Sequence, residues 1–161
     1  MSKALLYVEY TILASSMAIM AIITFANVLS RFFFGLSLSF TEEVTINLFV
    51  LLTFVGASVG IYKGAHLGFN LLYEKANNVN KVISSIFVGA VIAFFFFVVA
   101  YHGLDIVSAQ WERGQTTPAL GWPQWVFSSA VPFGAVLCII RTIESTVKSI
   151  ISIKNESVNE S

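Results

Sequence analysis

The stretch VISSIFVGAVIAFFFFVVAYHGL, residues 82–104, contains no Asp, Glu, Lys or Arg. A helix needs about 20 mostly apolar residues to cross the hydrocarbon core of a bilayer, so this run predicts a membrane-spanning helix. Three further runs qualify on the same grounds: residues 4–30, 44–62 and 122–140. The sequence therefore predicts an all-α membrane protein with four transmembrane helices.

The composition of the whole chain agrees with a lipid environment. Hydrophobic residues make up 57% of the chain and charged residues 11%, against about 25% charged residues in an ordinary soluble domain. Nine Lys and Arg balance nine Asp and Glu, so no basic field for nucleic acid is present and membrane lipid is the expected surrounding. A single cysteine, Cys138, excludes an intramolecular disulfide and a CxxC metal or redox site. We expect no catalytic residue, metal or cofactor.

The four spans are expected to form one domain, residues 1–154. Helical spacing of Ile143, Val147 and Ile150 predicts that the fourth helix continues past the membrane, and the tail 155–161 is expected to be disordered. The N-terminus is not interpreted as a cleaved signal peptide. The apolar part of such a peptide is about 7–15 residues long, whereas this chain has no charged residue from 10 to 30.

The positive charges predict the orientation of the spans, because Lys and Arg are retained on the cytoplasmic side of a membrane. With four spans, both termini and the middle loop share one side. That side holds seven of the nine Lys and Arg residues, and the other holds Arg31 and Arg113. The sequence therefore predicts a multi-pass membrane protein with both termini in the cytoplasm. The seven are Lys3, Lys63, Lys75, Lys81, Arg141, Lys148 and Lys154.

Two loops have distinct compositions. The middle loop, residues 63–81, mixes apolar residues with Lys and Asn, which fits either a short helix lying in the inner interface or an irregular polar loop. The second outer loop is flanked by Trp111, Trp122 and Trp125, and Trp rings favour the headgroup level of a membrane.

Ionisable residues are scarce within the spans. We expect Glu9 to reach the interface and Asp105 to lie at the outer end of the third span, which leaves a proton-coupled exporter without a carboxylate at mid-depth. A redox anchor that binds haem through two histidines needs both in the bilayer, but only His102 lies in a span and His66 is in the middle loop. For His102 we expect a hydrogen bond to Asp105, three residues on.

Two patterns near the second span suggest contact with another helix. Gly56, Gly60, Gly64 and Gly68 follow one another at intervals of four and predict a face that allows close helix packing, either against a partner or within the chain. The run Ser39-Phe-Thr-Glu42 predicts a capping box at the start of that span. Glu43 beside it could then pair with a cation of a partner subunit or remain solvated.

These residues resemble a known family. The runs Asn27-Val-Leu-Ser-Arg-Phe-Phe-Phe-Gly35, Ser39-Phe-Thr-Glu-Glu43 and Lys63-Gly-Ala-His-Leu67 are similar to the small integral-membrane (Q-type) subunit of tripartite ATP-independent periplasmic (TRAP) transporters. The run Pro118-Ala-Leu-Gly-Trp-Pro-Gln-Trp125, with Pro132, Gly134 and Arg141 after it, agrees. The resemblance covers roughly residues 10–141 and implies a subunit of a bacterial or archaeal inner membrane.

The resemblance implies two partners: a large membrane subunit that contains the transport site, forming a heterodimer with this chain, and a periplasmic substrate-binding protein. It implies sodium-driven uptake of an organic acid, such as a C4-dicarboxylate or sialic acid, with this chain as a scaffold and part of the docking surface. As hypotheses, the large subunit contacts Glu42, Glu43, Gly56, Gly60, Lys63, Gly64 and His66, and the binding protein lies near Arg113, Gln115 and Trp122. The alternative function is the membrane anchor of a redox complex or a small stand-alone exporter.

Overall fold

A computed structural model describes residues 2–63 and 78–159. Four helices among these residues are long and apolar enough to cross a membrane, which confirms the predicted number of spans and the all-α fold class. A short fifth helix precedes the last one. The helices are α1 Ser2–Phe34, α2 Ser39–Tyr62, α4 Asn78–Glu112, α5 Gln124–Ser128 and α6 Ala130–Asn159.

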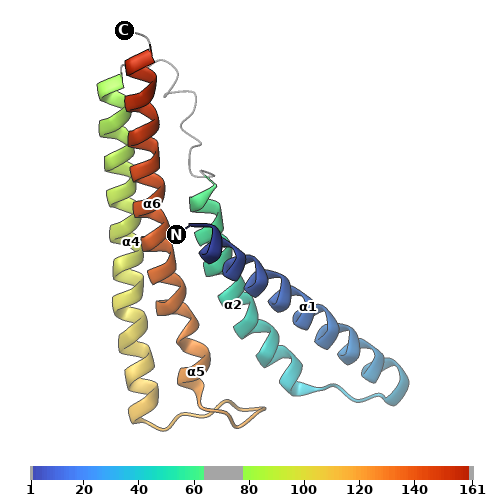
Figure 1. Cartoon of the computed structure of the whole chain (residues 1–161). Helices are drawn as coiled ribbons and strands as arrows, with labels where there is room; N and C mark the ends of the chain where they lie inside the picture. The colour runs from blue at the N-terminus through green and yellow to red at the C-terminus, as the bar shows by residue number, and fades with distance from the viewer. Residues whose placement is uncertain (1, 64–77, 160–161) are drawn as a thin grey trace.

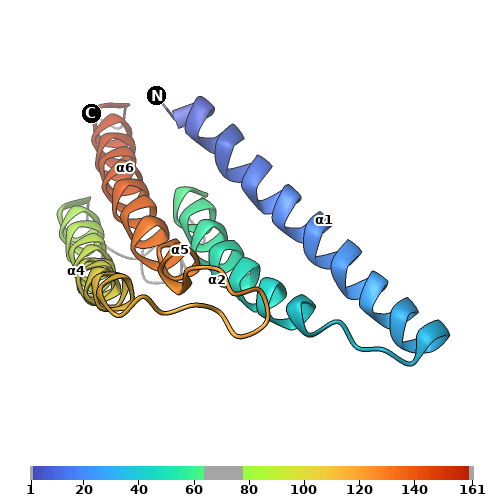
Figure 2. The ribbon, with the colours of Figure 1, turned by 90° about the horizontal axis from the view of Figure 1, so that it is seen from below.

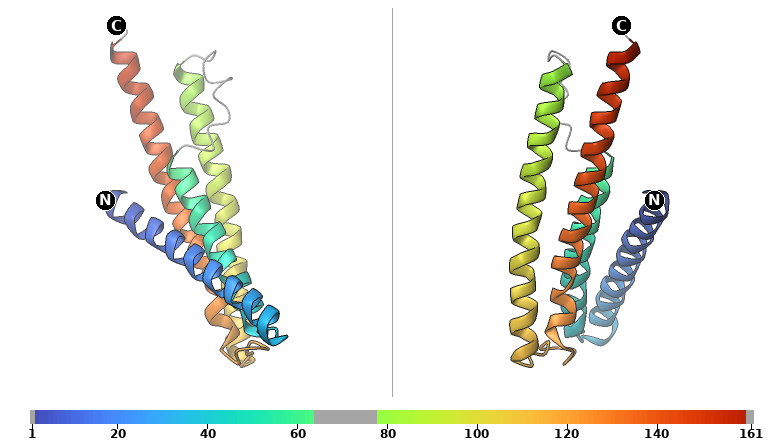
Figure 3. Two further views of the ribbon diagram at one scale, coloured as in Figure 1. Left: turned by 90° about the vertical axis from the view of Figure 1, so that its right-hand side faces the viewer. Right: turned by 60° about the vertical axis from the view of Figure 1, so that its left-hand side comes forward.

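The long helices stand in a row rather than in a closed bundle. Viewed from below, the order is α4, α6, α2, α1, with α6 packed between α4 and α2 (Figure 2). Helices α4 and α6 run side by side, whereas α1 and α2 lean away from them toward one end of the molecule (Figure 1). We name that end, which contains residues 34–39 and 112–124, the Trp end. Both chain termini point away from the Trp end (Figure 3), so we name the opposite end the terminal end.

Glycines end two of the helices at the Trp end. Gly35 follows α1 and Gly114 follows the last residues of α4, with φ angles of 67° and 59°. A residue with a side chain rarely adopts this left-handed conformation, so glycine is the usual residue after a helix C-terminus.

Helix α2 begins without the predicted capping box. Leu38 is the N-cap residue, and no side chain bonds to the free N–H groups there. Ser39 is already helical, so its hydroxyl is not in the N-cap position that a capping box requires. Asn27 of α1 instead accepts a hydrogen bond from the Leu38 N–H at 2.8 Å. This prediction was wrong because a side chain of the preceding helix organises the start of α2.

The last span is divided near the Trp end. Helix α5 ends at Ser128 and α6 begins at Ala130. Pro132 has no N–H with which to bond to the carbonyl of Ser128, four residues earlier, so a regular helix is interrupted at this point. A Cβ atom on Gly103 of α4 would lie 3.2 Å from Cδ of Pro132, so the interruption is also a point of close contact between α4 and α6.

The closest packing within the chain depends on glycines outside the predicted ladder. A Cβ atom on Gly134 of α6 would overlap Phe54 of α2, and one on Gly89 of α4 would overlap Thr146 of α6. At Gly56, in the ladder, a Cβ atom would only touch Leu13 of α1 at 3.9 Å. Gly134 and Gly89 therefore bring backbones together at the two interfaces of α6, more closely than Gly56 does between α2 and α1.

Most of the long helices extend beyond the predicted spans at one or both ends. Helix α4 starts before residue 82 and continues to Glu112, and α6 continues to Asn159, into the segment 155–161 expected to be disordered. The continuation of the fourth helix past residue 140 is confirmed. The middle loop, for which either an interfacial helix or an irregular polar loop was expected, falls mostly on residues 64–77, outside the described residues, and its last residues belong to α4.

Candidate functional site

A buried ion pair joins α1 to α6 on the terminal-end side of the row. Arg141 of α6 donates from Nε to Oε1 of Glu9 at 3.0 Å and from Nη2 to Oε2 at 2.5 Å. The hydroxyl of Ser58 in α2 donates to the same Oε1 at 2.6 Å. All three side chains are fully buried. A two-bond contact between a guanidinium and a carboxylate fixes both groups in orientation, so this pair holds the beginning of α1 against α2 and α6.

A second, more exposed layer of charge surrounds Arg141. Nη1 of Arg141 donates to Oε2 of Glu144 at 2.7 Å, and Nζ of Lys148 lies 3.1 Å from Oε1 of the same carboxylate. The ring of Tyr62, the last residue of α2, is 4.4 Å from Cζ of Arg141 and 4.1 Å from Nζ of Lys148. Cations above an aromatic face are stabilised by its quadrupole. We name Glu9, Ser58, Tyr62, Arg141, Glu144 and Lys148 the charge cluster.

The burial of Glu9 in the charge cluster differs from the sequence-based prediction. Glu9 was expected to reach the interface, but none of its surface is exposed. The sequence contained a usable signal: an acid near the start of the first span and a base near the end of the fourth lie at similar depth when both termini are on one side. Opposite charges at one depth on two helices are expected to pair, because each alone is costly in lipid.

At the Trp end, the loop between α4 and α5 is folded on itself. Thr116 and Pro123 face each other as an isolated antiparallel bridge, and the Thr117 N–H donates to the Trp122 carbonyl at 2.7 Å. Beside the bridge, the rings of Trp111 and Trp125 lie 4.8 Å apart at the centroids. We name residues 113–123 the Trp-end loop.

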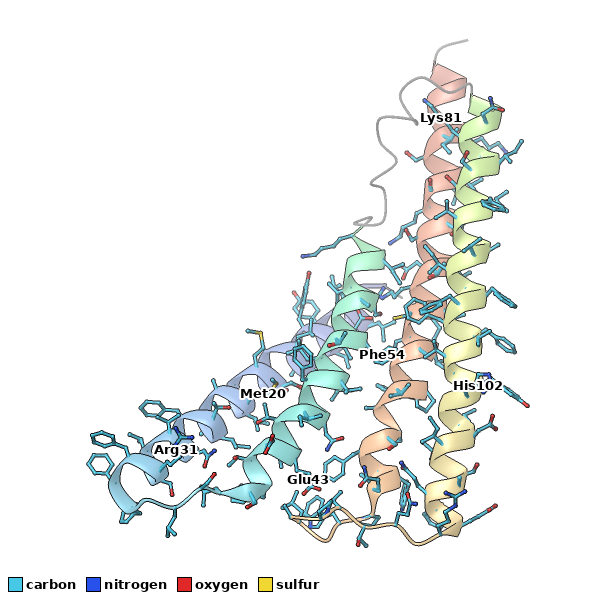
Figure 4. All side chains as sticks on the ribbon, turned by 180° about the vertical axis from the view of Figure 1, so that it is seen from behind. Met20, Arg31, Glu43, Phe54, Lys81 and His102 are labelled. Atoms are coloured by element: carbon cyan, nitrogen blue, oxygen red, sulfur yellow. The ribbon has the colours of Figure 1, made fainter. Side chains whose placement is uncertain are left out.

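Glu43 attaches this loop to α2. Its Oε2 atom accepts a hydrogen bond from the Leu120 N–H at 3.0 Å, and Figure 4 shows Glu43 on the part of α2 nearest the loop. The loop otherwise bridges the space where α2 has diverged from α5 and α6 (Figure 1). The carboxylate therefore links two segments that are 77 residues apart in the sequence.

The residues proposed for the binding protein lie together on the Trp-end loop and its margins. Arg113, Gln115 and Trp122 are all exposed. A groove beside them is lined by Trp111, Gly114, Gln115, Thr116, Pro123 and Trp125. The folded loop thus presents aromatic, amide and guanidinium groups on one end of the molecule.

The residues proposed for the large subunit are not gathered in one place. Glu42 is exposed beside the half-buried Glu43 at the Trp end of α2, whereas Lys63 follows the other end of α2 and lies over the Tyr10 ring of α1 at 5.3 Å. Gly60 is half-buried in α2. Gly64, His66 and Gly68 lie outside the described residues.

His102 lies next to Asp105 on α4, as expected, but without a hydrogen bond. The Nδ1 atom of the imidazole is 3.6 Å from Oδ2 of the carboxylate, which is longer than a hydrogen bond. Within residues 2–63 and 78–159, no three His, Cys, Asp or Glu side chains are grouped so that they could hold a metal ion.

Comparison with known proteins gives a consistent result. Residues 20–151 match the family model described as tripartite ATP-independent periplasmic transporters, DctQ component. The chain is 30% identical over 148 residues to the ectoine TRAP transporter small permease protein TeaB of Halomonas elongata, covering 89% of this chain and 75% of that protein. It is 26% identical over 110 residues to the C4-dicarboxylate TRAP transporter small permease protein DctQ of Rhodobacter capsulatus, covering 68% of this chain and 48% of that protein.

Proposed function

Because this chain belongs to the DctQ component family of tripartite ATP-independent periplasmic transporters, we propose that it acts as the static scaffold of a sodium-driven uptake system for an organic acid. In this proposal the chain forms a heterodimer with a large subunit that moves the substrate. A periplasmic binding protein delivers the substrate to the pair. Both termini lie in the cytoplasm, and the Trp end faces the periplasm.

The observation that carries the scaffold role is that the two buried charges of the charge cluster are bound to each other. Glu9 and Arg141 are the buried charged residues of the described spans, and each is bonded to the other. A residue that binds and releases a substrate or a coupling ion must exchange its partners, and a buried, two-bond ion pair resists such exchange. The pair therefore suits a helix row that stays rigid while another subunit moves.

The Trp-end loop supports the docking part of the proposal. Its exposed Trp122, Arg113 and Gln115 belong to residue types that are common at protein interfaces or able to bond across them. The positive-inside distribution of Lys and Arg supports a position of this loop on the outer side, where the binding protein would be.

We assign the selection of the substrate to the partner chains rather than to this subunit. Relatives of this chain carry names that specify ectoine in one case and C4-dicarboxylates in another. A scaffold common to such systems does not itself select the solute. We therefore propose an organic acid as the substrate class, with selection by the binding protein and the large subunit.

The test is reconstitution of the three chains in liposomes with an inward sodium gradient. We expect uptake of the binding protein's ligand only when all three are present, and loss of uptake when the gradient is removed. Undiminished uptake without this chain would contradict the scaffold role. Haem absorbance in the purified chain would instead favour the redox-anchor alternative.

A further inference from the structure

Two pairs of ionisable side chains near the ends of the predicted spans differ in burial. Arg141 and Glu9 form the first pair, with 0% and 1% of their side-chain surfaces exposed. His102 and Asp105 form the second, with 69% and 61% exposed. The first pair is satisfied inside the chain, whereas the second is on the surface of α4.

The second pair lies well inside the level marked by the Trp rings. Trp111 packs against Trp125 near the end of α4, and such rings favour the headgroup region. At a rise of about 1.5 Å per residue, Asp105 lies about 9 Å and His102 about 14 Å further into the membrane along α4. A short Asp side chain cannot reach back over that distance. A carboxylate exposed to hydrocarbon is costly, so a protein partner is the better surrounding for it.

The neighbours of this pair on α4 form a surface suited to another helix. Phe94, Val98 and Tyr101 precede Asp105 at intervals of three and four residues, which places them on the same helix face. All three side chains are exposed on the surface of the helix row. The rings of Tyr101 and His102 meet edge to face at 5.4 Å, and Figure 4 shows His102 on the side of α4 turned away from α6. We name Phe94, Val98, Tyr101, His102 and Asp105 the α4 stripe.

We propose that the α4 stripe is the surface on which a transmembrane helix of the large subunit docks, with an Arg or Lys side chain of that helix paired to Asp105. This inference rests on the proposed function, which supplies the large subunit. The argument for a cation is charge complementarity: the 3.6 Å separation from His102 leaves the carboxylate oxygens free to accept hydrogen bonds. Apolar packing along Phe94, Val98 and Tyr101 supplies the remaining contact, as in other helix pairs in lipid.

The first experiment tests whether the large subunit covers the α4 stripe. In a Cys138→Ser background, a spin label is attached to Tyr101→Cys on the stripe or to Phe25→Cys on α1. The two native side chains are similarly exposed, at 59% and 65%. Oxygen accessibility is compared for the chain alone and for the complex with the large subunit. We expect a several-fold drop at position 101 and none at 25. No drop at 101, or equal drops at both positions, would overturn the proposal.

The second experiment tests whether the negative charge of Asp105 is needed to bind the large subunit. We expect Asp105→Lys to reduce co-purification with the large subunit at least tenfold and Asp105→Asn to reduce it less. The control is Glu112→Lys, an exposed acid on the same helix face that lies two turns further out, next to Trp111 and beyond the stripe, for which a much smaller reduction is expected. Wild-type yield with Asp105→Lys would overturn this inference alone. Failure of the wild-type chain to co-purify would instead overturn the proposed function.

Discussion

The two ends of the helix row are held together in different ways. On the terminal-end side, α1, α2 and α6 share the buried charge cluster, whose ion pair has two direct bonds and a third from Ser58. At the Trp end, α2 has separated from α5 and α6, and the Glu43 carboxylate ties the Trp-end loop to it. One end is therefore built to be rigid and the other to present an adjustable surface. Mutations at the two ends should separate stability from partner binding.

The largest effect is expected from breaking the buried pair. Arg141→Met leaves the Glu9 carboxylate buried without its cation, which costs about 3–5 kcal/mol in proteins where such pairs have been broken. We expect the unfolding transition in an SDS titration of the detergent-solubilised chain to move to much lower SDS. The double variant Glu9→Leu with Arg141→Met removes both charges and should recover most of the loss. Equal stability of the single and double variants would contradict a coupled pair.

A smaller loss is expected from filling the closest helix contact. Gly134→Ala places a methyl group where Phe54 already packs (Figure 4), and overpacking of this kind costs about 1–3 kcal/mol. Gly56→Ala is the matched control, since its Cβ would meet Leu13 at an ordinary 3.9 Å. The same SDS titration should show destabilisation for the first variant and little change for the second. A reversed order would mean that the α2 ladder, and not the α6 contact, sets the spacing of the row.

The four spans could be predicted because length and hydropathy are local properties of the sequence. The ends of the helices could not, since stretches of mixed polarity, such as residues 105–112 and 141–159, continue a helix after its uniformly apolar run. The capping box was predicted wrongly because the Asn27 bond to Leu38 joins residues 11 positions apart. Local spacing does not reveal which distant side chain will arrive at a helix terminus.

The grouping of candidate site residues was predictable only where they are close in sequence. His102 and Asp105 are three residues apart and lie together, and Arg113, Gln115 and Trp122 share one loop. Glu9 and Arg141 are 132 residues apart. Recognising this pair requires a comparison of how deep each residue lies in the membrane on its own span. Glu43 was assigned to a partner subunit, and its bond to Leu120 depends on the fold of a loop that no periodic pattern describes.

At the Trp end, Glu43→Ala tests whether a single hydrogen bond positions the loop. Removing the acceptor should release the Leu120 N–H and the loop tip while leaving the charge cluster intact. We expect faster amide exchange in residues 115–123, a loss of about 1 kcal/mol or less in global stability, and weaker binding of the periplasmic partner. Glu43→Gln keeps an acceptor oxygen and is the matched control. If Glu43→Ala abolished binding of the large subunit without faster amide exchange in the loop, the result would contradict this prediction. It would support a contact of Glu43 with the large subunit instead.

The smallest effect is expected at the rim of the charge cluster. Lys148 is half exposed and pairs with Glu144 four residues earlier, and exposed pairs at this spacing contribute only about 0.3–0.5 kcal/mol. Lys148→Gln should therefore barely change the unfolding transition, and raising the salt concentration should remove the difference from wild type. The Arg141→Met loss should survive the same salt, because a buried pair is shielded from mobile ions. If salt removed both effects alike, the terminal end would be as accessible to solvent as the Trp end, and the contrast between a rigid end and an adjustable end would fail.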